Sequence, residues 1–358
     1  MTLPDGPAPL DPWWLEHLVC PVERSPLRLE GRFLISPGGR RYPVVDGAPV
    51  MLPPEAAATI RALRASLELA TAIAEGHASG EGPLYLTTLG VSKAEREVAL
   101  ELHASGADYD PVVAVAVGAT SGYAYRRLIG KVGPDYPIPA LRFPTPAPGR
   151  LLDIGSNWGR WTLAAARAGH AAVGIDPQLA AVLAGTRVAR QLGLPARFLV
   201  GDARFLPFRA DAFDYAWSYS VLQHFAPEDA TVALREVGRV VRPGGLARVQ
   251  MANRLGLRSL FHMARRRFRR PRDFEVRYWT PASLVAAFDQ AIGPTRLDAD
   301  CFLGLGLQWS DFGRMGGVGK AALLVSEVAR RTSTVLPPLK LLADSLFCTA
   351  RRTERAAV

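Results

Sequence analysis

Three acidic residues, Asp153, Asp176 and Asp202, each stand at or just after the end of an apolar run, in LLD, AAVGID and ARFLVGD. After the first acid, Gly155, Asn157 and Gly159 lead into the helix-forming stretch TLAAARAG. Glycine readily adopts positive φ, and backbone N–H groups at such a corner and helix start can approach a ligand. An acid at the end of the second strand is where ribose hydroxyls are bound in open α/β sheets. The spacing therefore predicts a small-molecule site.

Five strands in order must position these residues. After the three runs above, the segment FDYAWSYSVLQHF predicts a fourth strand, and LREVGRVVRPGGLARVQM predicts a helix followed by a fifth strand. Strands that alternate with helical segments favour a mostly parallel sheet, whose carboxyl ends meet at one edge.

Residues 150–252 resemble a class I S-adenosylmethionine-dependent methyltransferase of the group that acts on small molecules. The resemblance implies an α/β, Rossmann-like, seven-stranded, mostly parallel sheet with an antiparallel last strand. It also implies S-adenosyl-L-methionine as cofactor, S-adenosyl-L-homocysteine as product, and a set of cofactor-binding residues. These are Asp153, Gly155, Ser156, Asn157 and Gly159 for the methionine part, Asp176 and Pro177 for the ribose, Asp202 and Ala203 for the adenine, and Ser218. Asn157 stands where the family usually has glycine, and Asn also tolerates the left-handed region. A nicotinamide cofactor is disfavoured because Asp202 on the third strand fits the methyltransferase pattern.

The methyltransferase domain is expected over residues 150–352, with a sixth strand near 294–302 and the antiparallel last strand in LFCTARR. Two insertions interrupt it, a basic one at 253–279 and a helical one at 303–345. The Gly-Gly-Val-Gly-Lys run ending at Lys320 lacks the spacing and the following Ser or Thr of a phosphate-binding loop.

Residues 1–54 resemble a small zinc-ribbon domain through the tail YPVVDGAPVML. The metal ligands of that family are not matched, because after Cys20 the next ligand position holds Glu23 and the later pair falls on Ser36 and Gly39. Structural zinc takes four ligands, usually Cys and His. We therefore expect a degenerate, β-rich, metal-free ribbon that packs on the catalytic domain or forms an oligomer contact.

Residues 55–149 form a helical linker or lid region in this interpretation. Ile60, Leu63, Leu67 and Ala70 recur at helical spacing, and a Pro-rich run then leads to the first strand of the sheet. The segment before that strand commonly covers the substrate in this family, so Tyr123 and Arg126 are candidate substrate contacts.

The basic insertion carries nine arginines between Arg254 and Arg277, with apolar residues at helical spacing. A basic amphipathic helix can lie on an anionic membrane or bind phosphate, whereas a solvated helix face is the simpler alternative. His262, Arg277 and Tyr278 are further substrate candidates, because the insertion follows the carboxyl end of the fifth strand.

Methyl transfer chiefly requires alignment of the acceptor with an already activated methyl group and exclusion of water. A base is needed only when the acceptor arrives protonated. His224 has the right chemistry for a base near neutral pH, and Tyr219 follows the same strand end. No cluster of acids and histidines indicates a catalytic metal.

With 358 residues the chain is long enough for two domains, and 49% hydrophobic residues suffice for a core. Three scattered cysteines and no apolar run of membrane-spanning length favour a cytoplasmic protein, with peripheral contact at the inner membrane face left open. The net charge of +10 is compatible with an anionic metabolite, a glycan, a lipid- or nucleotide-linked acceptor, or an anionic membrane. A tRNA, RNA or protein methyltransferase is the alternative, although no RNA-binding domain or NPPY-like motif is present. The third hypothesis is a non-catalytic cofactor-binding scaffold.

Overall fold

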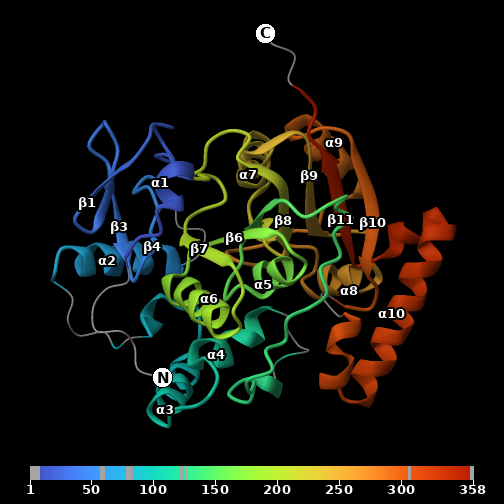
Figure 1. The fold of residues 1–358 in the computed structure, drawn as a ribbon. Helices are drawn as coiled ribbons and strands as arrows, with labels where there is room; N and C mark the ends of the chain where they lie inside the picture. The colour runs from blue at the N-terminus through green and yellow to red at the C-terminus, as the bar shows by residue number, and fades with distance from the viewer. Residues whose placement is uncertain are drawn as a thin grey trace.

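The computed structural model describes residues 9–56, 61–77, 82, 84–120, 125, 127–304 and 308–354. Its centre is a seven-stranded sheet in the order β10-β11-β9-β8-β5-β6-β7 (Figure 1). The strands are β5 (Arg150–Ile154), β6 (Ala171–Asp176), β7 (Ala196–Val200), β8 (Phe213–Tyr219), β9 (Val241–Ala252), β10 (Thr295–Cys301) and β11 (Ser345–Arg351). The five strands from β5 to β9 are parallel, and β11 lies antiparallel between β9 and β10. The predicted fold class is therefore confirmed.

Alternate side chains of the central strands enter two separate cores. On β5, Leu152 and Ile154 pack with α7 (Pro227–Val240) and α9 (Pro281–Ala291), whereas Leu151 faces α5 (Arg160–Arg167) and α6 (Leu179–Gln191). A strand that is buried on both faces must be almost wholly apolar, which is why these strands read as continuous hydrophobic runs. The helix α9 begins after Thr280, whose side chain accepts a hydrogen bond from the Ser283 N–H.

The N-terminal ribbon forms its own four-stranded antiparallel sheet after the short helix α1 (Trp13–His17). Its strands are β1 (Arg28–Glu30), β2 (Phe33–Ile35), β3 (Arg41–Val45) and β4 (Ala48–Pro49). It lies against the β7 edge of the large sheet, where the Met51 N–H donates to the Val200 carbonyl at 2.7 Å (Figure 1). An open edge strand is prone to intermolecular pairing, so the ribbon protects this one.

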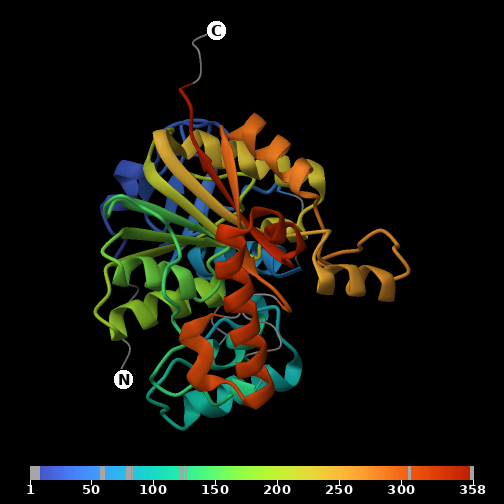
Figure 2. The same ribbon diagram turned by 90° about the vertical axis from the view of Figure 1, so that its right-hand side faces the viewer.

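Helices from the region before the sheet extend from the ribbon, where the first of them packs on β3, to the outer face of α6. They are α2 (Arg61–Ala74), η1 (Leu86–Thr88), α3 (Lys93–Ala104) and α4 (Pro111–Thr120). The late insertion adds η4 (Trp309–Arg314), α10 (Gly317–Val335) and η5 (Pro337–Leu342), while the basic insertion forms α8 (Leu257–Arg265), which stands away from the body in Figure 2. Among the described helices, none is both long and apolar enough to cross a bilayer.

Candidate active site

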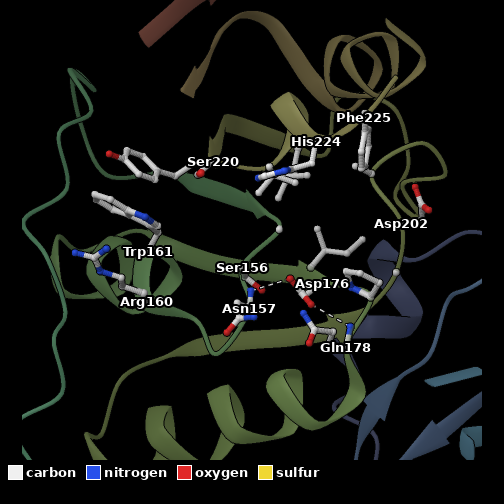
Figure 3. A pocket seen from close by; sticks show the side chains of 18 of the residues that line it. Ser156, Asn157, Arg160, Trp161, Asp176, Gln178, Asp202, Ser220, His224 and Phe225 are labelled. Atoms are coloured by element: carbon white, nitrogen blue, oxygen red, sulfur yellow. Dashed lines mark hydrogen bonds between the residues drawn. The ribbon is translucent and has the colours of Figure 1, made fainter. Parts of the chain in front are cut away.

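A pocket that is partly open to solvent lies at the carboxyl edge of the parallel strands (Figure 3). Residues that follow β5, β6, β7 and β8 form its wall, which the parallel topology explains because these strand ends meet at one edge. The lining residues are Ile154, Gly155, Ser156, Asn157, Arg160, Trp161, Ile175, Asp176, Pro177, Gln178, Gly201, Asp202, Ala203, Tyr219, Ser220, Val221, His224, Phe225 and Phe274.

The corner after β5 is held in a conformation that suits glycine. Gly155, Asn157 and Gly159 all have positive φ, and a Cβ added at Gly155 would lie 2.2 Å from a methyl carbon of Val221. Asn157 accommodates its left-handed backbone because its side-chain oxygen accepts a hydrogen bond from the Trp158 N–H at 2.9 Å. The chain can therefore bring the backbone of Gly155 and Ser156 to the pocket surface.

Asp176 ends β6 with its carboxylate bound to two backbone donors. Asn157 N–H donates to Oδ2 at 2.9 Å and Gln178 N–H donates to Oδ1 at 3.0 Å. Burial raises the pKa of Asp176 to about 6, although these two hydrogen bonds oppose the shift. Each oxygen keeps a lone pair for a further donor, so the ionised carboxylate is equipped to bind two hydroxyl groups.

The helical region fixes the loop after Asp176 from outside. The hydroxyls of Ser66 and Thr88 accept hydrogen bonds from the Leu179 and Ala180 N–H groups at the start of α6. The Gly90 N–H donates to the Gln178 side chain at 3.0 Å. Ser66, Thr88 and Gly90 thus hold the start of the helix that carries this wall of the pocket. The helical spacing in the sequence did not predict these contacts.

Three of the predicted cofactor residues stand behind the pocket wall. Asp153 is buried and accepts a hydrogen bond from Thr162 at 2.6 Å, while Ser218 is buried and donates to the Ile154 carbonyl at 2.9 Å. Burial and the nearby Asp176 raise the pKa of Asp153 to about 7. Gly159 caps α5. These residues hold the corner in place, and the others in the predicted set line the pocket.

Asp202 and Ala203 lie on the pocket wall after β7. The Asp202 carboxylate pairs with Arg204, with 2.6 Å between Oδ2 and the guanidinium, and accepts a hydrogen bond from the Arg204 N–H at 2.8 Å. Arg204 also pairs with Asp229 on α7. This pairing over two residues fixes the orientation of the carboxylate, and the sequence analysis did not predict it.

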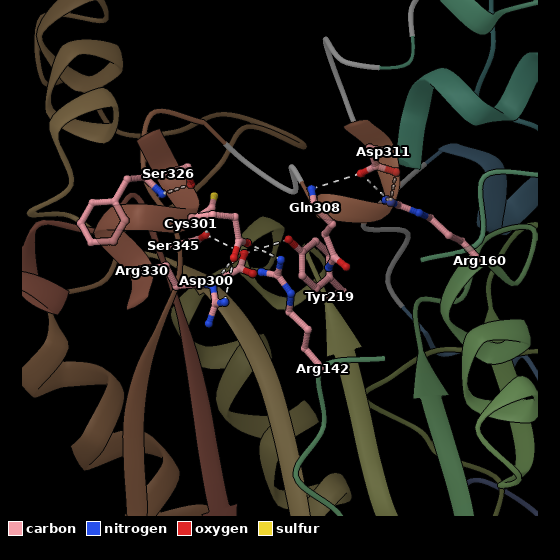
Figure 4. Close-up of polar contacts among 12 residues, drawn as sticks. Arg142, Arg160, Tyr219, Asp300, Cys301, Gln308, Asp311, Ser326, Arg330 and Ser345 are labelled. Carbon is pink, nitrogen blue, oxygen red and sulfur yellow. Dashed lines mark hydrogen bonds and ion pairs between the residues drawn. The ribbon is translucent and has the colours of Figure 1, made fainter. Parts of the chain in front are cut away.

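Both catalytic candidates, Tyr219 and His224, line the pocket, but their side chains have different hydrogen-bond partners. Tyr219 donates its buried hydroxyl to Asp300 at 2.8 Å, and Ser345 donates to the same carboxylate oxygen (Figure 4). Burial raises the pKa of the phenol well above its usual value, so the hydroxyl keeps its proton and its hydrogen bond to Asp300. His224 stacks on Phe274 with ring centroids 4.0 Å apart, and its Nδ1 donates to the Phe274 carbonyl at 2.7 Å.

Burial lowers the pKa of His224, so its ring is neutral at pH 7. The hydrogen bond at Nδ1 leaves Nε2 as the unprotonated nitrogen of the neutral ring. Arg277, one of the substrate candidates, donates to the His224 carbonyl and lies beneath this loop.

Of the other substrate candidates, His262 and Tyr278 do not line this pocket. Tyr123 and Arg126 lie outside the described residues. His262 and Tyr278 line a second hollow together with Arg265, Arg266, Arg267 and Arg269, and only Phe274 is shared with the first pocket.

Arg160 and Trp161 form a part of the wall that sequence reasoning missed. The buried Arg160 guanidinium lies 3.3 Å from Asp311 of η4 and donates to the Tyr125 hydroxyl at 2.9 Å (Figure 4). Trp161 packs on Tyr219 with ring centroids 4.8 Å apart. Asp311 is 151 residues from Arg160, so no local pattern joins them.

The zinc-ligand positions of the ribbon come together around Glu23. Its carboxylate accepts hydrogen bonds from the Ser36 hydroxyl at 3.0 Å and the Gly38 N–H at 3.2 Å, and lies 3.4 Å from Arg40. Cys20 is the one thiol there, and its sulfur contacts the Tyr42 hydroxyl at 3.2 Å. This donor set does not fit a tetrahedral zinc, because the carboxylate already bridges the two loops.

A family model described as a methyltransferase domain matches residues 151–245, which include every strand end of the pocket. A UPF0434 protein of Nitrobacter winogradskyi is 50% identical over 62 residues, 16% of this chain and 94% of that protein, and fits the N-terminal segment. The chain joins a UPF0434-family segment to an S-adenosylmethionine-dependent methyltransferase domain.

The methyltransferase domain has relatives with named activities. A demethylmenaquinone methyltransferase of Corynebacterium kroppenstedtii is 30% identical over 156 residues, 43% of this chain. The chain spans 59% of that relative's length. A solved structure of a Burkholderia thailandensis 1,6-didemethyltoxoflavin-N1-methyltransferase with bound S-adenosylhomocysteine is 16% identical, covers 92% of this chain and all of that one, and has a TM-score of 0.40.

The pocket of the methyltransferase domain fits the cofactor of its family. The Ser156 hydroxyl is buried in the wall and has no hydrogen-bond partner among the described residues, so it has capacity for a further hydrogen bond. Asp176 offers two carboxylate oxygens at the next strand end, and Ile175, Ala203 and Phe225 supply apolar surface for a flat base. Residues of the required types thus lie in one cavity.

Proposed function

We propose that this chain transfers a methyl group from S-adenosyl-L-methionine to a small-molecule acceptor. The observation that supports it most is that one pocket contains both the acid end, with Asp176 and Asp202, and an aromatic end with Trp161, His224 and Phe274. Aromatic surface beside the cofactor residues suits a small acceptor, because small-molecule sites are mostly apolar clefts with a few polar groups.

In this proposal, different residues of the pocket bind the three parts of the cofactor. Asp176 accepts hydrogen bonds from the ribose hydroxyls, the surface of Ile175, Ala203 and Phe225 holds the adenine, and the corner at Gly155 and Ser156 binds the methionine part. The cofactor supplies a methyl group already activated by its sulfonium. The protein must then align the acceptor and exclude water, and Trp161 and Phe274 supply the apolar surface for both tasks.

His224 is the proposed base for an acceptor that arrives protonated. Its Nδ1–H is held by the Phe274 carbonyl, so Nε2 would take the proton of the acceptor. The acceptor's lone pair would form the bond to the methyl carbon as the carbon–sulfur bond breaks and its electron pair stays on sulfur. The lowered pKa keeps the ring neutral and able to accept that proton. Tyr219 is not a second base, because its hydroxyl is committed to Asp300.

A small molecule is favoured over nucleic acid as the acceptor for two reasons. The relative from Corynebacterium kroppenstedtii is named for a small-molecule acceptor. In addition, the pocket wall itself carries one arginine, Arg160, and its guanidinium is shared with Asp311 and Tyr125. The several free cations that backbone binding of nucleic acid requires would have to come from outside this pocket.

The test uses the full chain with tritium-labelled S-adenosylmethionine and three acceptor fractions: small molecules, total tRNA and protein. We expect label in the small-molecule fraction and about a hundredfold less with His224→Asn. Label in tRNA or protein would contradict the small-molecule acceptor. Binding of S-adenosylhomocysteine without transfer to any fraction would favour the scaffold hypothesis.

A further inference from the structure

Residues 254–278, here called the arginine arm, concentrate the charge of the protein. The arm carries nine arginines against Asp273 and Glu275, a net charge of +7 out of +10 for the whole chain. It consists of α8 and the loop that follows, and Figure 2 shows both standing away from the rest of the molecule.

The arm is firmly attached at its base. The Asp344 carboxylate accepts hydrogen bonds from the Arg258 and Ser259 N–H groups at 2.7 and 3.1 Å, which caps the start of α8. Ser259 is the buried residue of this helix. The rest of α8 therefore projects from a fixed point, with most of its surface facing solvent.

Large apolar side chains are exposed along the arm. Leu257, Phe261 and Phe268 are 58%, 63% and 67% exposed, and Leu260 lies between them at 41%. Arg267 and Phe268 have positive φ at the end of α8, a conformation that costs energy for side chains of this kind. Isolated exposed apolar residues are ordinary, but several on one short helix mark an interaction surface.

Most of the guanidinium groups remain available beside these apolar residues. Glu275 pairs with Arg266 and Arg269, and the described part of the chain contains no ion pair for Arg265, Arg267 or Arg270. Four of the arm's arginines, His262 and Tyr278 line the second hollow. The arm thus presents exposed apolar side chains beside cations, of which Arg265, Arg267 and Arg270 form no ion pair with the described residues.

We propose that the arginine arm docks on a bilayer surface that contains anionic lipids. Leu257, Phe261 and Phe268 enter the boundary between headgroups and acyl chains, and the arginines contact lipid phosphates. RNA would engage the arginines but would leave the leucines of α8 exposed, so the apolar surface favours the bilayer. A free anionic metabolite would likewise leave the exposed apolar surface of the arm without a partner.

Docking would bring the bilayer beside the aromatic end of the pocket. Phe274 of the arm lines both hollows and stacks on His224. The proposal concerns the docking surface and does not depend on which acceptor is methylated.

The test measures co-sedimentation of the full chain with vesicles of phosphatidylcholine alone or with a quarter phosphatidylglycerol. We expect binding about tenfold tighter to the anionic vesicles, weakened by high salt. Phe261→Ser with Phe268→Ser, and separately Arg267→Gln with Arg270→Gln, should each weaken it about tenfold. Leu100→Ser, at a 51% exposed leucine on α3, is the matched control and should change nothing.

Retained S-adenosylhomocysteine binding and unchanged melting temperature establish that the arm variants are folded. Equal binding to neutral and anionic vesicles, or no binding to either, would overturn the proposal. Tighter binding to tRNA than to anionic vesicles would also overturn it. So would a dimer, detected by light scattering, that forms through the arm and prevents binding to vesicles.

Discussion

Replacing Asp176 with Asn removes the negative charge of the side chain and keeps its size and shape. The carboxylate accepts one backbone hydrogen bond on each oxygen and, in our proposal, two ribose hydroxyls as well. An amide keeps one acceptor oxygen and turns its NH₂ toward a backbone N–H about 3 Å away, so donor meets donor. A hydrogen bond to a charged group contributes about 1.5–3 kcal/mol. We therefore expect S-adenosylhomocysteine binding to weaken by about 2–3 kcal/mol, which is about 30- to 150-fold in Kd.

Isothermal titration calorimetry at pH 8 measures this directly. Asp289→Asn, at an exposed acid on α9, is the control for charge alone and should leave Kd unchanged. Because the pKa of Asp176 is raised to about 6 and hydroxyl donors favour its ionised form, wild-type affinity should fall as the pH drops below 6, by up to about tenfold per unit. The Asn variant should lack that dependence. A change in Kd of less than about threefold at pH 8 would refute the ribose assignment.

Three further substitutions test other parts of the site and the ribbon. Gly155→Ala should abolish S-adenosylhomocysteine binding, because its Cβ would meet Val221 at positive φ; Gly193→Ala, also at positive φ but with open space, should retain it in the same titration. Tyr219→Phe should lower the free energy of unfolding in urea by about 1–3 kcal/mol with less than about a tenfold loss of kcat, and a larger loss would make the phenol catalytic. Glu23→Ala should lower Tm in differential scanning fluorimetry, and EDTA should not change the Tm of the parent or the variant; a fall with EDTA would reveal a metal.

The catalytic sheet was predictable because each strand ends in a residue with a conformational or chemical signature. Gly155 and Asn157 need positive φ, and Asp176 follows a strand buried on both faces, so local sequence sufficed for these positions. The antiparallel β11 followed from the family resemblance and is found where that resemblance placed it.

Contacts between distant segments were beyond such reasoning. The sequence around Arg160 does not predict its ion pair with Asp311. The sequence around His224 does not predict that its ring stacks on Phe274. Both depend on insertions whose direction is set by tertiary packing. The ribbon is an intermediate case, since the loss of ligands was visible but the bridging role of Glu23 became clear only from its contacts with Ser36 and Gly38.

The most direct test of the central claim is a crystal structure of the full chain with S-adenosylhomocysteine. We predict density across the edge of β5, β6 and β7, with both ribose hydroxyls on the Asp176 carboxylate and the adenine against Ala203 and Phe225. Density elsewhere, or a ribose bound without Asp176, would contradict the account.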